Sequence, residues 1–297
     1  MVPLSINELT TLRWSFEEDV LNCRSAGISA LGVWRPKLAD YGEQRGIELL
    51  AEHGIAVSNL LWAGGFTERE PSTFKEALAD AEEAIELAAR LDAGCLVLYS
   101  GGRAGHTAKH ARRIFRDALK HLDPIAAAHG VTLAVEPMHE AIAEPFTVLT
   151  SLDATLETIA AANCRSTRLV FDTYHMGHGN VPLAKIAEVA PRVAVVHLAD
   201  ARGAPEDEQN RCRLGNGNLP LGDMIAALVA GGYRGYYDVE LFGQDVEWFD
   251  YAELIEHSQR AFNRLGVPME PTVSVKAAVP ASRNAADECN FERRAVG

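Results

Sequence analysis

The sequence predicts a single closed (β/α)8 barrel, and three of its features lead to this prediction. Short apolar runs typical of β-strands recur along the chain, and segments with helical periodicity separate them. Strand and helix alternate about every 30 to 40 residues, which is typical of βα units that build a parallel sheet. The length of 297 residues also fits a barrel, which typically needs about 250 residues.

The strands are expected where β-branched, aromatic and other apolar residues cluster between polar segments. They are predicted at Leu4–Leu9, Ile28–Trp34, Ala56–Trp62, Cys95–Tyr99, Thr132–Glu136, Arg168–Asp172, Val193–His197 and Tyr236–Glu240. Eight βα units favour a closed barrel over the alternative, a doubly wound open sheet.

Helices are expected where apolar residues recur at steps of three and four. The segments are Phe74–Leu91, Ile114–Ala128, Leu152–Ala162, Leu221–Val229 and Tyr251–Leu265. The third is expected to begin after an N-cap at Ser151, with Asp153 in its first turn. Glycines that precede apolar runs are interpreted as left-handed residues at helix ends. They are Gly27, Gly54, Gly94 and Gly130.

The chain is expected to form one catalytic domain followed by a tail. Residues 1–267 contain all of the predicted barrel. From Pro268 onward the composition changes and no clear period remains. Residues 268–297 are therefore predicted to be a loosely held tail, to which no function is assigned.

The composition is that of a soluble globular enzyme, with 47% hydrophobic and 23% charged residues. The net charge is −13. This balance argues against a nucleic-acid partner, because binding to phosphates depends on clustered Lys and Arg. A small neutral, cationic or metal-complexed substrate is expected instead, and the sequence leaves homo-oligomerisation open.

A cytoplasmic location is expected from three features. The five cysteines are scattered and contain no CxxC pair, which is typical of free thiols in a reducing compartment. The first residues mix Asn7, Glu8 and Arg13 into the apolar stretch, so no signal peptide is predicted. No apolar run approaches the roughly 18 residues of a membrane helix.

The strongest functional pattern lies at the ends of the last four predicted strands. The apolar runs finish on Glu136, Asp172, His197 and Glu240, respectively. In a barrel the carboxyl ends of the strands meet at one opening, where the active sites of such enzymes lie. Since side chains two apart share a face, these four should point into the barrel at its top. A single acid at a strand end is more often a helix cap or a surface charge, but four in succession argue against that reading.

Four such groups do not converge without compensation. Three carboxylates at close range repel one another, and burial adds a desolvation cost for each charge. A divalent cation resolves both problems. Three oxygen ligands and one imidazole suit Mn²⁺ first, then Mg²⁺ or Co²⁺, with Zn²⁺ and Fe²⁺ as further options.

Several neighbouring residues are candidates for substrate binding. His175 follows Asp172 by three residues and is either a ligand of a substrate oxygen or a helix-capping histidine. Asp200 either orients an imidazole, binds substrate, or is a solvated loop acid. Arg211 is a fixed cation on a loop above the opening, and Arg213 competes for that role. Three further candidates for the pocket lining, each also explained as structural, are His139, His106 and Trp34.

A glycine-rich segment follows the fourth strand at Gly101-Gly102-Arg103-Ala104-Gly105. It is a weak candidate for admitting a phosphate at the next helix N-terminus, because it lacks a full phosphate-loop pattern.

At these residues the sequence resembles the sugar phosphate isomerase/epimerase family, the xylose isomerase-like TIM barrels. The resemblance covers roughly residues 4 to 265. It is most specific in Val135-Glu136-Pro137-Met138-His139, Phe171-Asp172-Thr173-Tyr174-His175, Val196-His197-Leu198-Ala199-Asp200, residues 211–217, and Val239-Glu240-Leu241-Phe242. It implies that Glu136, Asp172, His197 and Glu240 are metal ligands, and that His175 and Arg211 touch substrate.

One position departs from the family pattern. Ketose 3-epimerases resembling this chain carry a substrate-binding glutamate six residues after the first ligand, where this sequence has Ile142. Glu140 and Glu144 lie nearby but out of register. This departure argues against a free-ketose 3-epimerase and leaves an inosose or another keto-sugar open as substrate.

The expected function is that of a metal-dependent sugar isomerase or epimerase. The reaction would pass through an enediolate, with Glu136 and Glu240 as the catalytic pair that removes and returns a proton. A lyase or hydratase acting on keto-sugars or 3-keto-glycosides is the nearest alternative. An abasic-site endonuclease would need further metal ligands and a basic face, and a non-catalytic sugar-binding protein is the alternative outside enzymes.

Overall fold

The structure is a computed structural model, and it describes residues 4–68, 73–144, 146–179, 181–205, 210–244 and 246–267. The predicted tail at 268–297 lies outside the described residues. Eight parallel strands form a closed barrel in the order β1-β2-β3-β4-β5-β6-β7-β10, and β10 pairs back with β1. The prediction of a closed barrel is therefore confirmed, and the open-sheet alternative is wrong.

The barrel strands all begin and end close to the predicted positions. They are β1 (Leu4–Asn7), β2 (Ala30–Trp34), β3 (Ala56–Ala63), β4 (Leu96–Leu98), β5 (Leu133–Val135), β6 (Thr167–Asp172), β7 (Val193–Leu198) and β10 (Tyr237–Val239). A separate antiparallel ribbon pairs β8 (Asp200–Ala201) with β9 (Arg211–Cys212).

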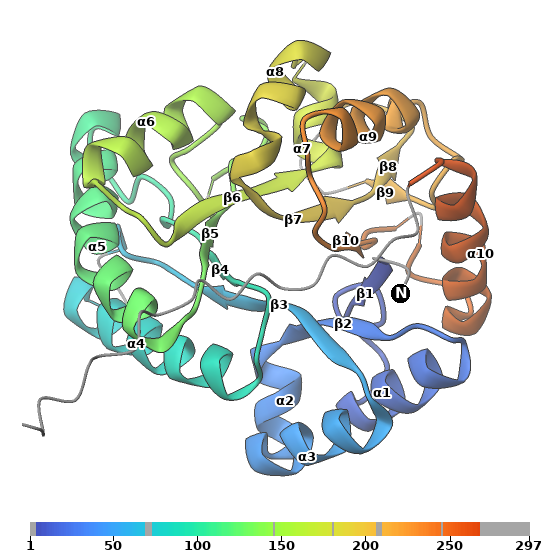
Figure 1. The fold of residues 1–297 in the computed structure, drawn as a ribbon. Coiled ribbons are helices and arrows are strands. Elements are labelled where there is room, and N and C mark those ends of the chain that lie inside the picture. Colours follow the sequence, from blue (N-terminus) through green and yellow to red (C-terminus); the bar gives the residue numbers. More distant parts are fainter. Residues whose placement is uncertain are drawn as a thin grey trace, which may run out of the picture.

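Helices surround the barrel as an outer ring (Figure 1). They are α1 (Phe16–Ser25), α2 (Arg35–Tyr41), α3 (Glu43–His53), α4 (Phe74–Arg90), α5 (Ala108–His129), α6 (Leu152–Ala162), α7 (Thr173–His178), α8 (Leu183–Val189), a 3₁₀ turn at Ala190–Arg192, α9 (Leu221–Ala230) and α10 (Tyr251–Arg264). Among the described residues, no helix combines the length and the apolarity that crossing a membrane requires.

Local signals explain most helix ends. Ser151 caps α6 by accepting a hydrogen bond from the Ala154 amide, as predicted. Gly27, Gly54 and Gly130 have φ values of 77°, 63° and 70°, as expected for left-handed residues at helix ends. The interpretation of Gly94 is wrong: α4 ends at Arg90, and a Cβ at Gly94 would lie 2.4 Å from the Ser58 carbonyl oxygen. Gly94 is thus required for close contact between backbones.

Apolar side chains form two layers of core. The larger layer lies between the strands and the helices. The smaller fills the barrel interior, where Leu61, Val97, Ala134, Val170 and Val195 are buried. This inner layer supports the carboxyl ends of the strands, where polar residues replace apolar ones.

Gly32 in β2 makes room for a buried polar side chain inside the barrel. A Cβ at this position would lie 2.3 Å from Asp238 Oδ2 and 3.0 Å from Asn59 Nδ2. We expect Gly32→Ala to lower the free energy of unfolding by about 1–3 kcal/mol, because the added methyl group overpacks the interior. Urea unfolding followed by circular dichroism measures this change.

Gly222→Ala is the matched control. Gly222 lies in α9, and a Cβ added to it would have no neighbouring atom within 4 Å, so alanine should be neutral or stabilising there. Equal losses of stability in the two variants would contradict the crowding described at Gly32.

Candidate metal centre and substrate pocket

Glu136, Asp172, His197 and Glu240 converge at the carboxyl end of the barrel. Glu136 follows β5, Asp172 ends β6, His197 lies in β7 and Glu240 follows β10. Each offers one ligand atom, and these atoms all lie within 4.8 Å of one another. All four side chains are buried. The strands therefore bring together the four residues that the sequence predicted as ligands.

The donor atoms of this cluster fit a cation. Glu136 Oε2 and His197 Nδ1 are both buried without a hydrogen-bond partner. Buried polar atoms are normally paired, so two such atoms in one cluster of acids indicate a missing positive charge. Three carboxylates and one imidazole match the ligands preferred by a divalent metal ion.

The orientation of His197 favours coordination through Nδ1. Its Nε2 lies 3.4 Å from Asn59 Oδ1, and Asn59 Nδ2 donates to Asp238 Oδ2 at 2.8 Å. Nδ1 faces the acids, 3.4 Å from Glu136 Oε1 and 3.2 Å from Glu240 Oε2. Metal-binding histidines commonly use this arrangement, in which the second ring nitrogen donates to a neighbouring oxygen.

Electrostatics at the cluster show how strongly it attracts positive charge. Burial lowers the pKa of His197, but Glu240 and Glu136 raise it well above the ordinary value. Burial raises the pKa of Glu136, and the nearby Glu240 and Asp172 charges add to this increase. Both increases include a contribution from the same cause, which is a local excess of negative charge that a divalent metal ion would neutralise.

Arg211 is part of the cluster and is fully buried. Its guanidinium nitrogens lie 2.9 Å from Asp172 Oδ2 and 3.0 Å from Glu240 Oε2. The group also stacks over Tyr174 and Phe242, at 4.9 and 4.6 Å from the ring centroids. Burial raises the pKa of Glu240, but Arg211 and His197 lower it to about 2. Arg211 thus keeps Glu240 ionised.

Arg213, the alternative candidate, does not share this position. It is half-buried and stacks over Phe249 at 4.3 Å. The β8–β9 ribbon explains the difference, since Arg211 lies in β9 whereas Arg213 follows it.

His175 is placed to donate a hydrogen bond into the pocket. Asp172 Oδ1 caps α7 by accepting from the amides of Tyr174 and His175, so His175 is not itself the capping residue. The His139 amide donates to His175 Nδ1 at 3.3 Å. Burial lowers the pKa of His175 to about 4. The ring is therefore neutral, and its proton lies on Nε2, which has no hydrogen-bond partner in the structure.

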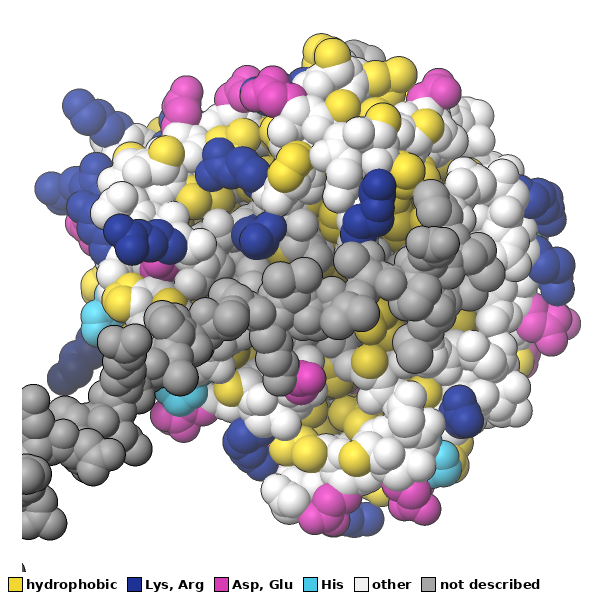
Figure 2. All heavy atoms as spheres, in the orientation of Figure 1, with side chains coloured by type: hydrophobic (Ala, Val, Ile, Leu, Met, Phe, Trp, Pro, Cys, Tyr) yellow, Lys and Arg dark blue, Asp and Glu magenta, His cyan; other side chains and the backbone are white. Residues whose placement is uncertain are grey.

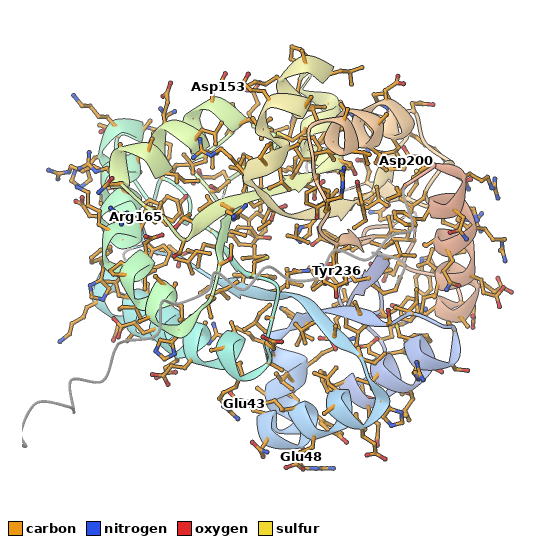
Figure 3. The ribbon with its side chains drawn as sticks, viewed as in Figure 1. Glu43, Glu48, Asp153, Arg165, Asp200 and Tyr236 are labelled. Carbon is orange, nitrogen blue, oxygen red and sulfur yellow. The ribbon has the colours of Figure 1, made fainter. Side chains whose placement is uncertain are left out.

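Asp200 is buried and accepts hydrogen bonds from backbone amides on both of its carboxylate oxygens. Its Oδ1 accepts from the amides of Ala201 and Leu219, and its Oδ2 accepts from those of Gly215 and Gly217, all within 3.2 Å. It is 1% exposed, so it is not a solvated acid, and it lies beside the β8–β9 region and α9 (Figure 3). Asp200 organises the loop after β9 instead of contacting His197.

A small pocket of about 170 Å³ opens above the cluster. Four of the predicted site residues line it, namely Glu136, His175, Arg211 and Glu240. The other lining residues were not predicted as site residues from the sequence; they are Leu9, Leu12, Trp62, Tyr99, Met138, Phe146 and Phe242. Burial next to Glu136 raises the pKa of Tyr99 well above its ordinary value. Trp62 and Tyr99 lie near the carboxyl ends of β3 and β4. This position at strand ends is the sequence signal that could have identified them as pocket residues.

The remaining candidates do not line this pocket. His139 contacts His175 from behind through its amide, while Trp34 and His106 border separate grooves. The glycine-rich segment at residues 101–105 precedes a larger groove of about 640 Å³ between α5 and α6. Lys109, Arg112, Arg113 and Arg116 border that groove, and Figure 2 shows Lys and Arg side chains gathered at the left edge, over α5.

Removing the Arg211 guanidinium should destabilise the folded protein, because the repulsion between Asp172 and Glu240 is then no longer compensated. We expect Arg211→Met to lose about 3–5 kcal/mol of folding stability in the presence of a chelator, since it leaves buried carboxylates uncompensated. Arg213→Met is the control, because Arg213 forms no ion pair with any described acid. Urea unfolding measures both variants, and a similar small loss in each would contradict the compensating role of Arg211.

Comparisons with known proteins agree with this architecture. An inosose isomerase from Halalkalibacterium halodurans is 24% identical over 255 residues, which cover 80% of this chain and 87% of that protein. A structure from Sinorhizobium meliloti 1021 matches with a TM-score of 0.82 at 27% identity, covering 88% of this chain and 98% of the other. The structure of the IolI protein with zinc matches with a TM-score of 0.77 at 20% identity, covering 89% and 98%.

The family description "Xylose isomerase-like TIM barrel" matches residues 20–265, which is most of the chain and includes all four clustered residues. The chain belongs to the xylose isomerase-like TIM barrel family.

Proposed function

We propose that this protein is a metal-dependent sugar isomerase or epimerase that acts on an inosose or another keto-sugar. The observation that carries the proposal is a pair of buried glutamates, Glu136 and Glu240, which both lie within 3.4 Å of His197 Nδ1 and line the same pocket. The similarity to an inosose isomerase supports the same reaction class.

Glu136, Asp172, His197 and Glu240 would hold the metal ion. We propose Mn²⁺, because three oxygen donors and one imidazole suit it; the zinc in the related IolI structure makes Zn²⁺ the main competitor. When bound, a divalent ion acts as a Lewis acid that polarises a carbonyl and makes the neighbouring C–H more acidic.

The residues of the chain supply the proton transfers. One of Glu136 and Glu240 removes the proton next to the carbonyl, and the other returns a proton to the opposite face or the adjacent carbon. Between these events the substrate exists as an enediolate. The neutral His175 donates its Nε2 proton to a substrate oxygen, while Arg211 fixes Glu240 in the ionised form that can accept a proton.

The pocket walls favour a small, uncharged polyol. At about 170 Å³ the cavity is smaller than the roughly 300–1,000 Å³ of drug-sized ligand sites. Trp62, Tyr99 and Phe146 give the pocket aromatic walls against which the C–H faces of a polyol can pack. Ile142, at the position where related ketose 3-epimerases have a glutamate, is buried, which supports an inosose or similar keto-sugar over a free ketose.

The other expectations about the protein's surroundings stay predictions. The net charge of −13 supports a small carbohydrate over nucleic acid as the partner. The cytoplasmic location and homo-oligomerisation remain predictions from the sequence.

The test is deuterium exchange. The Mn²⁺-loaded protein is incubated with a panel of inososes and keto-sugars in D₂O, and NMR or mass spectrometry detects deuterium on a carbon adjacent to the carbonyl. Exchange should stop on chelation and fall by about 10²–10⁴-fold in Glu136→Gln and Glu240→Gln, the usual contribution of a general acid or base.

Glu144→Gln, on the exposed surface, is the matched control and should retain the wild-type exchange rate. The proposal fails if the Glu136 and Glu240 variants bind Mn²⁺ and still exchange at the wild-type rate. Release of an aglycone from a 3-keto-glycoside without exchange into recovered substrate would instead indicate the lyase.

A further inference from the structure

A second group of ionisable residues is buried beside the barrel, outside the metal cluster. Glu8 follows β1, Asp19 lies in α1 and Lys37 lies in α2, and their side chains are 0%, 0% and 8% exposed. Lys37 Nζ lies 2.6 Å from Asp19 Oδ2 and donates to the Thr11 carbonyl oxygen at 2.8 Å. Glu8 Oε2 accepts from the Trp34 amide at 2.6 Å.

The charges of this group do not balance when both acids are ionised. One lysine then faces two carboxylates, and Glu8 Oε1 and Asp19 Oδ1 are each buried without a hydrogen-bond partner. A proton on Glu8 removes the imbalance, because a protonated carboxyl can donate to a carboxylate and the Glu8 and Asp19 side chains interact directly. The Thr11 hydroxyl is a second donor that interacts with Asp19. Burial and the Asp19 charge raise the pKa of Glu8 well above its ordinary value of 4.5. Burial also raises the pKa of Asp19, to about 6, although Lys37 opposes this.

Few other titratable groups face these acids. Cys23, on the same helix as Asp19, is buried nearby, and the charges of Asp19, Glu8 and Lys37 all affect its thiol. Asp19 and Lys37 are the charges that act most strongly on Glu8. Two further acids lie near the group: Glu18 in α1, which interacts with Lys37, and Asp238 in β10, whose charge acts on the Cys23 thiol.

The group is connected to the metal cluster through the β1–α1 loop. Thr10, in this loop, donates its hydroxyl to the Val239 carbonyl oxygen at 2.8 Å and accepts from the Leu241 amide at 2.8 Å. These two backbone groups flank Glu240. Leu9 and Leu12, in the same loop, line the substrate pocket. Glu8 and Lys37 hold the loop on the other side, through the Trp34 amide and the Thr11 carbonyl.

We propose that Glu8, Asp19, Lys37 and Thr10 form a positioning network for Glu240, in which a proton shared by Glu8 and Asp19 fixes the β1–α1 loop and Thr10 fixes the backbone of the metal ligand. The proposal rests on the proposed function only in taking Glu240 as a metal ligand and proton carrier. None of the four residues lines the substrate pocket, so each acts through the loop.

The first test removes the Thr10 hydroxyl without changing the size of the side chain. Thr10→Val loses both hydrogen bonds to the residues that flank Glu240, the one to the Val239 carbonyl oxygen and the one from the Leu241 amide, and Thr10→Ser keeps them. We expect Thr10→Val to weaken Mn²⁺ binding and to lower kcat for exchange by about tenfold or more, since small displacements of a catalytic group are costly. Thr10→Ser should restore both, and KM should change less than kcat.

The second test locates the proton. Because the pKa of Glu8 is raised in the folded state, its ionisation opposes folding, and its contribution to stability is lost progressively as pH rises above 4.5. Glu8→Gln keeps a donor toward Asp19 and does not titrate, so its Tm relative to wild type should increase between pH 5 and pH 8. Asp19→Asn removes the partner of Lys37 and should lower the Tm at both pH values.

The outcomes separate this network from the proposed function. The network would be overturned if Thr10→Val and Thr10→Ser bound Mn²⁺ with equal affinity. It would also be overturned if Glu8→Gln and Asp19→Asn showed an equal loss of Tm at both pH values. Neither result would contradict the proposed exchange reaction. A third outcome is that Thr10→Val binds Mn²⁺ more weakly while the wild-type protein catalyses no deuterium exchange on any substrate. This result would support the network and reject the proposed isomerase or epimerase reaction. A wild-type protein that binds no Mn²⁺ overturns both.

Discussion

Mutual repulsion between buried carboxylates is the constraint on which the rest of this structure depends. Glu136, Asp172 and Glu240 converge at one end of the barrel, where burial makes each negative charge costly. Arg211 compensates part of this charge from the β8–β9 ribbon. His197 provides the fourth donor, with Nδ1 directed at the acids. The remaining deficit of positive charge is what a cation would neutralise, and the proposed function assigns the proton transfers to two of these same carboxylates.

The surrounding residues hold these groups rigidly. Asp172 is both a candidate ligand and the N-cap of α7, so the position of His175 depends on it. Asp238 accepts from Ser5, Asn7 and Asn59, and Asn59 in turn lies against His197. Gly32 is required because Asp238 occupies the space that a side chain would fill. Buried polar networks of this kind fix the geometry of their members. This one extends from β1 across the barrel interior to β7, where His197 Nδ1 is left without a hydrogen-bond partner.

The sequence predicted the strands and the four clustered residues because both depend on local patterns. Apolar runs indicate strands. An acid or a histidine at the end of such a run lies at the carboxyl-end opening of the barrel, and this position does not depend on the conformation of the loops. Contacts between distant segments were not predictable in this way. The burial of Arg211 depends on the β8–β9 pairing, and the loop-organising contacts of Asp200 depend on the backbone of residues 214–219. The pocket residues Leu12 and Phe146 come from two separate loops and share no sequence pattern, whereas Trp62 lies at a strand end. Helix α1 was not delineated, although its capping box of Ser15 and Glu18 is a local signal.

The central claim is that one divalent ion binds at the convergence of four strands, and anomalous diffraction from crystals grown with Mn²⁺ tests it most directly. The account predicts one strong peak at about 2.0–2.3 Å from oxygens of Glu136, Asp172 and Glu240 and from His197 Nδ1. The contradicting result is a map with no anomalous peak among these four residues at saturating Mn²⁺, in which Arg211 and His197 are still paired to the acids.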